Sequence, residues 1–246
     1  MSKNSTSRFA QTLRERIIYE DNHLVVVNKN GGELVQGDNT GDQPLLEKVR
    51  EYLRWRYQKP GKVFCGLVHR LDRPTSGLVI FAKTGKGLSR MNEVFKQRKV
   101  EKRYYAITRV APQPEAGLLE HYLRKNAEKN KSFVVAEESK NSQMARLYYR
   151  CLASSKHYHL LEITLHTGRH HQIRAQFAQE GWPIKGDLKY GFDRSNPDGS
   201  ISLHAGYLAW EHPVKKEPIA LRCPVPSSDN LWSYFNPYLI TDFTGQ

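Results

Sequence analysis

The pattern of apolar and polar positions in the first hundred residues predicts short strands mixed with two helices. Residues 16–35, "RIIYEDNHLVVVNKNGGELV", contain two short β-rich stretches around a Gly-Gly turn. Residues 43–58 have apolar side chains at helical spacing with a charged opposite side, and 85–100 also read as a helix. The run "GLVIFAKT" (77–84) is short and rich in branched and aromatic side chains, which favours a buried strand.

The second half of the chain continues the mixed pattern. Residues 102–110 and 157–167 are predicted strands, from their β propensity and partial alternation. The polar stretch 124–142 between them is predicted to be a loop with a short strand. Residues 167–183 predict a helix that begins near a Thr N-cap and ends at a Gly, with Pro just beyond. The Pro-rich C-terminal third is expected to be irregular.

These elements predict an α+β fold, with a mixed, largely antiparallel sheet flanked by helices and loops. No repeat with a fixed period is present, and no long linker divides the chain. We therefore expect residues 1–15 to be a polar N-terminal tail and residues 16–246 to form one domain. The chain has 246 residues, which is enough for a full hydrophobic core.

The composition points to an anionic partner. Lys and Arg number 38 and Asp and Glu number 25, which gives a formal charge of +13. Such an excess favours nucleic acid first and an acidic membrane surface second. The apolar runs are too short to span a bilayer, and the N-terminus has no apolar signal segment. Three widely spaced cysteines indicate neither a zinc site nor a disulfide framework, so we expect a cytoplasmic protein.

One predicted helix raises the question of a buried charge. His170, Ile173, Arg174 and Phe177 form a single stripe at helical spacing, so Arg174 lies among apolar side chains and needs an anionic partner. Asp72, at the entrance to the predicted buried strand, has the complementary need, and we expect the two to meet. A nearby guanidinium lowers the pKa of an Asp whereas burial raises it, so the pair can hold an ionised carboxylate in a dry pocket. From this pattern alone a purely structural ion pair is favoured over a catalytic one.

Two motifs resemble the signatures of a known enzyme family. "GLVHRLDRPTSGLVIFAKT" (66–84) and "LHTGRHHQIRAQFAQEGWPIKGDLKYG" (165–191) are similar to those of the RluA-type pseudouridine synthases. Residues 22–32 resemble the first motif of that family, and residues 203–219 resemble its C-terminal block. The resemblance runs from about residue 17 to about residue 226, and the combination of the first two motifs is highly specific.

The resemblance implies a reaction on RNA. A uridine is detached from its ribose at N1, turned, and rejoined through C5, without a metal or an organic cofactor. Asp72 matches the essential aspartate of the family, which attacks the flipped nucleotide at ribose C1′ or at base C6. The substrate would be ribosomal or transfer RNA, and we expect a monomer.

The resemblance also suggests roles for other residues of the site. Arg70 matches the arginine that enters the RNA stack where the uridine leaves it, a role that suits a planar cation. Tyr104 matches the tyrosine that packs on the target base, and Arg174 matches the basic partner of the aspartate. Leu165 matches an aliphatic residue at the pocket, and His69 borders it as a structural hydrogen-bonding residue. The residues expected to contact RNA are Arg70, Arg73, Lys102, Arg103 and Arg169.

Three further patterns allow a functional and a purely structural interpretation. The basic and aromatic segment 95–109 fits an RNA-facing edge as well as it fits a solvated helix end. Tyr105 lies on the opposite strand face from Tyr104, so it is expected to pack inside the protein. The basic segment 124–131 is usually only a solvated loop, but here it can touch the RNA backbone. The histidines at 157–171 have no carboxylate or Cys at ligand spacing, so no metal site is expected.

The sequence departs from the family pattern at one motif. The first motif usually reads Lys-Pro-x-Gly, whereas this chain has Asn30 after Lys29, which removes a φ restraint and restores a backbone N–H. The residues before the motif are also too few for the S4-type RNA-binding domain of many relatives, so specificity is expected to come from the catalytic domain or a partner. A non-catalytic RNA-binding protein is the alternative function. A metal-dependent nuclease is disfavoured by the lack of clustered carboxylates.

Overall fold

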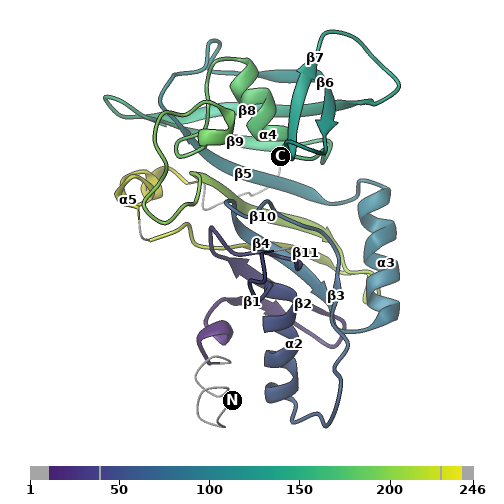
Figure 1. Ribbon diagram of the computed structural model, residues 1–246. Helices are drawn as coiled ribbons and strands as arrows, with labels where there is room; N and C mark the ends of the chain where they lie inside the picture. The colour runs from purple at the N-terminus through teal and green to yellow at the C-terminus, as the bar shows by residue number, and fades with distance from the viewer. Residues whose placement is uncertain (1–10, 39, 228, 240–246) are drawn as a thin grey trace. The chain divides into compact units, whose positions relative to one another are not determined.

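The computed structural model describes residues 11–38, 40–227 and 229–239, and its contacts divide the chain into two compact units (Figure 1). The first unit comprises the chain up to Val100 together with Tyr207–Pro224. The second comprises Glu101–Gly206 and the chain from Val225 onward. Strand β10 (Leu203–Glu211) begins in the second unit and ends in the first. Residues 16–246 thus belong to two compact units, and the expectation that they form one domain stays a prediction.

The first unit is built on a sheet whose strand order is β1-β2-β4-β10, with β3 paired to β4 and β11 paired to β10. The pairs β1–β2, β2–β4, β3–β4 and β10–β11 are all antiparallel. Every residue of β4 is buried, as the short apolar run predicts. The remaining bounds are β1 (Ile17–Glu20), β2 (Leu24–Lys29), β3 (Gly66–Leu67), β4 (Ser76–Ala82) and β11 (Pro218–Arg222).

Helices α2 (Leu45–Arg56) and α3 (Gly85–Lys96) accompany this sheet, both at predicted positions. Helix α3 begins directly after β4 because Thr84 caps it: the Thr84 hydroxyl accepts the Gly87 N–H at 3.0 Å. Its Met91 packs into a core formed mainly by β2, β4 and β10. Since β4 is fixed by this core, the loop that leads into it ends at a rigid element.

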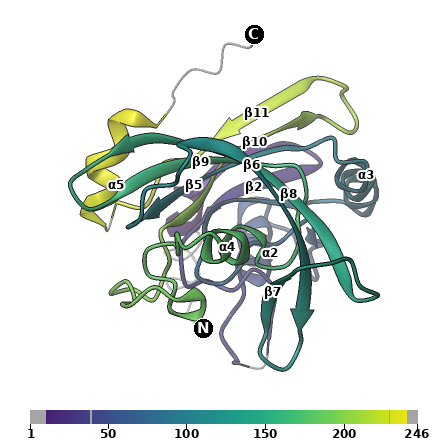
Figure 2. The same cartoon turned by 90° about the horizontal axis from the view of Figure 1, so that it is seen from above.

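The second unit contains a sheet of order β10-β5-β9-β8-β6-β7, in which β5–β9, β9–β8, β8–β6 and β6–β7 are antiparallel. Helix α4 (Gln172–Gln179) packs against β6 and β7, and Figure 2 looks along its axis. On β5, Tyr105 packs with Trp232 and Phe235 of helix α5 (Asn230–Phe235), which confirms its packing role. The strands are β5 (Glu101–Thr108), β6 (Ala116–Asn126), β7 (Lys131–Val135), β8 (Ser142–Ser154) and β9 (His159–Leu165).

Helix α4 begins later than its sequence suggests. Its N-cap is His171, in the left-handed region at φ 54°, so the predicted Thr167 cap is wrong. The Thr167 hydroxyl instead accepts the Arg146 N–H at 2.8 Å and donates to Gln172 Oε1 at 2.8 Å. The predicted end is confirmed, because Gly181 follows the helix with φ 81°.

The two ends of the chain also differ from the sequence pattern. Within the expected polar tail, residues 1–10 lie outside the described part, while residues 11–14 are helical and Leu13 is buried. The expectation of an irregular C-terminal third is wrong, because β10, β11 and α5 lie there. Among the described residues, no helix combines the length and the apolar character that a membrane span requires.

Candidate active site

The Asp72 loop, residues 70–75, leads into β4 in the first unit. Its turn is closed by the Thr75 N–H, which donates to the Asp72 carbonyl at 3.0 Å. Asp72 is half-buried, whereas Arg70 and Arg73 on either side are exposed. The loop therefore presents two cations to solvent around a partly covered carboxylate.

Lys29, at the end of β2, is hydrogen-bonded to the Asp72 loop. Its side chain is fully buried, and its ammonium donates to the carbonyls of Asn30 (2.8 Å), Arg73 (2.9 Å) and Thr75 (2.6 Å). Three acceptors match the three N–H bonds of an ammonium group. Burial lowers the pKa of Lys29 to about 7; the carboxylates of Glu33 and Asp72 oppose this shift, and Arg16 and Arg73 add to it.

The Arg73 side chain forms a hydrogen bond and an ion pair within the first unit. Its Nε donates to the Gly32 carbonyl at 3.0 Å, and its Nη2 pairs with Asp42 Oδ2 at 2.5 Å. The Gly32 N–H in turn donates to the Arg73 carbonyl at 2.8 Å. An RNA phosphate at Arg73 would compete with Asp42 for the guanidinium.

His69 has a structural environment. Its Nε2 accepts the Ile80 N–H at 3.2 Å, and its ring stacks on Phe95 with centroids 5.0 Å apart. A ring nitrogen that accepts a backbone N–H is not available as a base at that position. These contacts support the structural role predicted for His69, and they link the start of the Asp72 loop to β4 and α3.

Arg174, on α4 in the second unit, forms a buried bidentate ion pair with Asp187. Its Nε lies 2.6 Å from Asp187 Oδ2, and its Nη2 lies 2.9 Å from Asp187 Oδ1. The side chains are 5% and 1% exposed, so each charge depends on the other for solvation. Sequence reasoning did not assign this partner, although Asp187 lies within the quoted motif "WPIKGDLKYG".

The segment around Asp187 is fixed by its neighbours. Gly186 has φ 87°, and a Cβ there would lie 2.8 Å from the Asn196 side chain, so only glycine fits. Arg174 also lies over the Tyr190 ring at 5.0 Å. The Tyr190 hydroxyl lies 3.0 Å from His171 Nδ1 and accepts the Ser132 N–H at 2.9 Å. Burial, and secondarily the charge of Arg174, lower the pKa of His171 to about 2, so His171 is neutral.

Tyr104 and Leu165 also belong to the second unit. Tyr104 is buried on β5 opposite Ile163 of β9, and Leu165 is half-buried at the end of β9. Asp72 belongs to the first unit, whereas Tyr104, Leu165 and Arg174 belong to the second. The Asp72–Arg174 ion pair stays a prediction.

The remaining basic side chains expected to contact RNA also have contacts within the protein. Arg103 pairs with Glu101 at 2.5 Å, and the Arg169 Nε donates to the Met144 carbonyl at 3.0 Å. The Lys102 Nζ approaches Gly168, in the motif that precedes α4. Lys102, Arg103 and Arg169 are all half-buried, so each can present only part of its side chain to a ligand.

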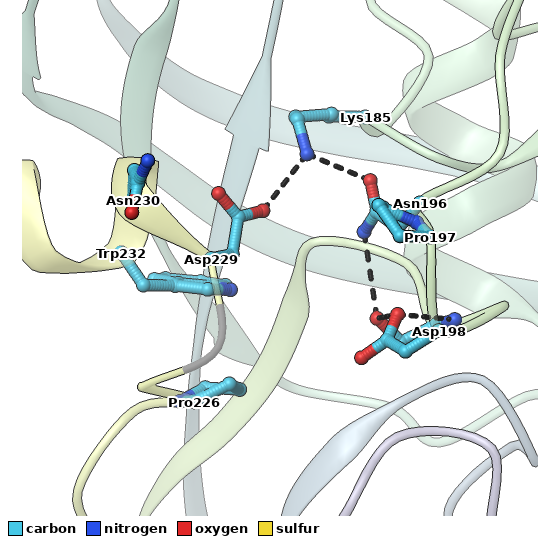
Figure 3. A pocket seen from close by; sticks show the side chains of 9 residues that line it. Lys185, Asn196, Pro197, Asp198, Pro226, Asp229, Asn230 and Trp232 are labelled. Carbon is cyan, nitrogen blue, oxygen red and sulfur yellow. Dashed lines mark hydrogen bonds and ion pairs between the residues drawn. The ribbon is translucent and has the colours of Figure 1, made fainter.

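Over the part of the chain that the structure describes, the predicted site residues belong neither to a metal-ligating cluster nor to the lining of a cavity in the second unit. No cluster of three metal-ligating side chains occurs among the residues that the structure describes. A cavity of about 370 Å³ in the second unit is lined by Lys185, Asn196, Asp229 and Trp232, among others (Figure 3). Lys185 donates to Asn196 at 2.7 Å and to Asp229 at 2.8 Å, so its charge is matched internally. None of the predicted site residues lines this cavity.

Comparison with known proteins agrees with the motifs. Residues 23–179 match the family described as RNA pseudouridylate synthase. The chain is 32% identical over 217 residues to ribosomal large subunit pseudouridine synthase C of Rickettsia typhi, covering 87% of this chain and 69% of that relative. It is 31% identical over 232 residues to synthase D of Vibrio cholerae, covering 88% and 69%.

A solved structure also resembles this one. Human RNA pseudouridylate synthase domain containing 4 aligns with a TM-score of 0.76 at 25% identity, covering 92% of this chain and 94% of the human one. The similarity therefore extends over both units and includes the segments that carry Asp72, Tyr104 and Arg174.

Proposed function

The chain belongs to the RNA pseudouridylate synthase family, and we propose that it converts specific uridines of ribosomal RNA to pseudouridine with Asp72 as the nucleophile. In this isomerisation the N1–C1′ bond breaks and a C5–C1′ bond forms. N1 gains a proton, and the proton on C5 is released to water. Every atom of the uracil ring is retained, so the reaction needs no external oxidant, reductant or group donor.

The observation that carries the proposal is the loop of Asp72. Backbone and side-chain bonds from Lys29 and Gly32 hold this loop, and its carboxylate is half-buried beside a buried cation. A carboxylate nucleophile acts in its ionised form, and a nearby positive charge favours that form. The bonds to the Arg73 and Thr75 carbonyls also restrict the directions in which the carboxylate can point.

The partners of Asp72 follow from the same motifs. We propose that Tyr104 packs on the target base, that Leu165 borders the pocket, and that Arg174 is the basic partner of Asp72. The exposed guanidinium of Arg70 would replace the stacking that RNA loses when the uridine flips out. Arg73, Lys102, Arg103 and Arg169 would contact the RNA backbone.

Ribosomal RNA is favoured over transfer RNA because the relatives from Rickettsia typhi and Vibrio cholerae are named as synthases of the ribosomal large subunit. The alternative, a non-catalytic RNA-binding protein with the same fold, would not need an aspartate at position 72. One experiment on Asp72 therefore tests the reaction and the substrate together.

The experiment compares cells that lack the gene with cells that carry it as wild type, Asp72→Asn or Asp193→Asn, with pseudouridines mapped across total RNA. Asp193 is the matched control because it is an exposed carboxylate paired with Arg109. We expect at least one large-subunit rRNA site to be lost without the gene, restored by wild type and by Asp193→Asn, and absent with Asp72→Asn. Full restoration by Asp72→Asn would rule out the nucleophile, and sites found only in tRNA would overturn the rRNA substrate.

A further inference from the structure

The 29–33 turn, residues Lys29 to Glu33, is a part of the first unit that is hydrogen-bonded to the Asp72 loop. Lys29 and Gly32 supply three hydrogen bonds to the carbonyls of Arg73 and Thr75, at 2.6 to 2.9 Å. Arg73 returns one bond through its Nε to the Gly32 carbonyl. The position of the Asp72 loop within this unit therefore depends on the conformation of the turn.

The turn is held by a bond that the usual motif does not permit. The Asn30 N–H donates to Glu33 Oε2 at 3.0 Å. A proline at position 30 would have no N–H, and its ring would fix φ directly. This chain lacks the conformational restraint of a proline at position 30 and has instead a hydrogen bond from the Asn30 N–H to the Glu33 carboxylate.

The carboxylate of Glu33 is itself anchored on two sides. Arg16 forms a two-point ion pair with it, and Lys48 of α2 lies 2.9 Å from Oε1. The Arg16 Nε also donates to the Asn28 carbonyl at 3.0 Å. Burial would raise the pKa of Glu33, but the bonds from Arg16 and Lys48 outweigh it and lower the pKa to about 2. Glu33 is therefore ionised throughout the neutral range.

Glu33 also affects the charge of Lys29. The negative charges facing Lys29 belong to Glu33 and Asp72, and the positive ones to Arg16 and Arg73. A neutral amine has only two N–H bonds for the three carbonyls around it, so one carbonyl would face a lone pair. Because the pKa of Lys29 is about 7, this loss occurs as the pH rises through neutrality. Without the charge of Glu33 it would occur at a lower pH.

We propose that Glu33 is a positioning residue of this synthase, which fixes the 29–33 turn through the Asn30 N–H and keeps Lys29 charged so that the turn holds the Asp72 loop. The proposal rests on the role of Asp72 proposed above. It assigns to Glu33 no contact with RNA and no part in the chemical step.

The decisive variant is Glu33→Gln, which keeps an oxygen acceptor for Asn30 but removes the charge. Its control is Glu47→Gln, which removes an ion pair with Arg50 on the surface of α2. The readout is the single-turnover rate of tritium release from RNA containing uridine labelled at C5, measured from pH 6 to 9. We expect the fall in rate at high pH to begin on the order of one pH unit lower in Glu33→Gln. The RNA Kd should change less than twofold, and Glu47→Gln should match wild type.

A second pair of variants tests the bond to Asn30. Glu33→Ala should lower the rate at least tenfold in the natural background, but by a smaller factor when Asn30→Pro is also present, since proline has no N–H to satisfy. Equal factors in both backgrounds, or a pH profile of Glu33→Gln identical to that of wild type, would overturn the proposal.

Amide hydrogen exchange separates this proposal from the assignment of Asp72. The Gly32 and Thr75 amides should exchange faster in Glu33→Gln than in Glu47→Gln, whatever the identity of the nucleophile. If Asp72→Asn remains active while this exchange difference is present, Asp72 is not the nucleophile, but Glu33 still positions the Asp72 loop through the turn. If exchange is unchanged, Glu33 does not hold the loop.

Discussion

At the scale of single residues, the ion pair between Arg174 and Asp187 should dominate the response of stability to mutation. Both side chains are almost fully buried, so removal of one leaves the other charged in an apolar environment. We expect Arg174→Ala to lower the free energy of unfolding by about 3–5 kcal/mol. Urea denaturation of the full chain measures this value.

The control for this prediction is Arg109→Ala, which breaks the exposed pair with Asp193. Because water solvates both of those groups, this variant should unfold at the same urea concentration as wild type. If Arg174→Ala also leaves the unfolding midpoint unchanged, the buried pair does not exist in solution.

The two charges differ in how well the sequence predicts them. Arg174 is predictable because apolar residues surround it at helical spacing, and its burial is confirmed. Its partner Asp187 lies in an irregular segment after Gly186, where no periodic pattern relates a side chain to a particular face. The available signal was a single acidic residue in the motif "WPIKGDLKYG", whose other charged residues are lysines, and only the tertiary structure assigns it to Arg174.

At the scale of elements, the sequence predicts the strands and helices whose apolar residues follow a clear period. It does not predict element boundaries or crossings that are set by tertiary contacts. The buried strand β4 and the amphipathic helix α2 lie where periodicity places them. Helix α4 was predicted, but its start was not, because the Thr167 hydroxyl accepts the Arg146 N–H instead of capping the helix. Strand β10 crosses between two units, a feature to which no local pattern corresponds.

The β6–β7 hairpin has a basic tip, which the sequence predicts can touch the RNA backbone. Lys131 donates to the Lys189 carbonyl at 2.5 Å, and Lys189 donates to the Asn130 carbonyl at 3.2 Å, so the tip is attached to its neighbours. Lys125 and Lys129 remain exposed on this tip. We expect Lys125→Ala with Lys129→Ala to reduce the slope of log K against log salt by about 0.7 for each phosphate that the variant no longer neutralises.

The matched control replaces Lys215 and Lys216, which are 50% and 70% exposed in the turn between β10 and β11. Filter binding of a large-subunit rRNA fragment at several salt concentrations measures both slopes. Equal slopes for the hairpin variant and wild type would show that the basic tip is only a solvated loop, which is the common fate of such segments.

At the scale of the whole molecule, the formal charge of +13 overstates the number of cations available to RNA. Arg103, Arg146 and Arg150 are each paired with a glutamate, and Arg73 is paired with Asp42. A phosphate at any of these positions replaces an existing carboxylate instead of binding an unmatched charge, so less affinity is gained at each position. Binding should depend on a subset of the 38 basic residues.

This argument predicts an intermediate salt dependence for the intact protein. If about five phosphates are neutralised, log K should fall with log salt at a slope of about −3 to −4. Asp72→Asn should show the same slope as wild type, because the aspartate is proposed to act on the nucleotide and not on the phosphates. A slope near zero would exclude a basic RNA-binding surface, whereas a slope near −10 would mean that the paired arginines leave their carboxylates when RNA binds. The same titration with Arg73→Ala separates these cases, since only release from Asp42 lets that residue contribute.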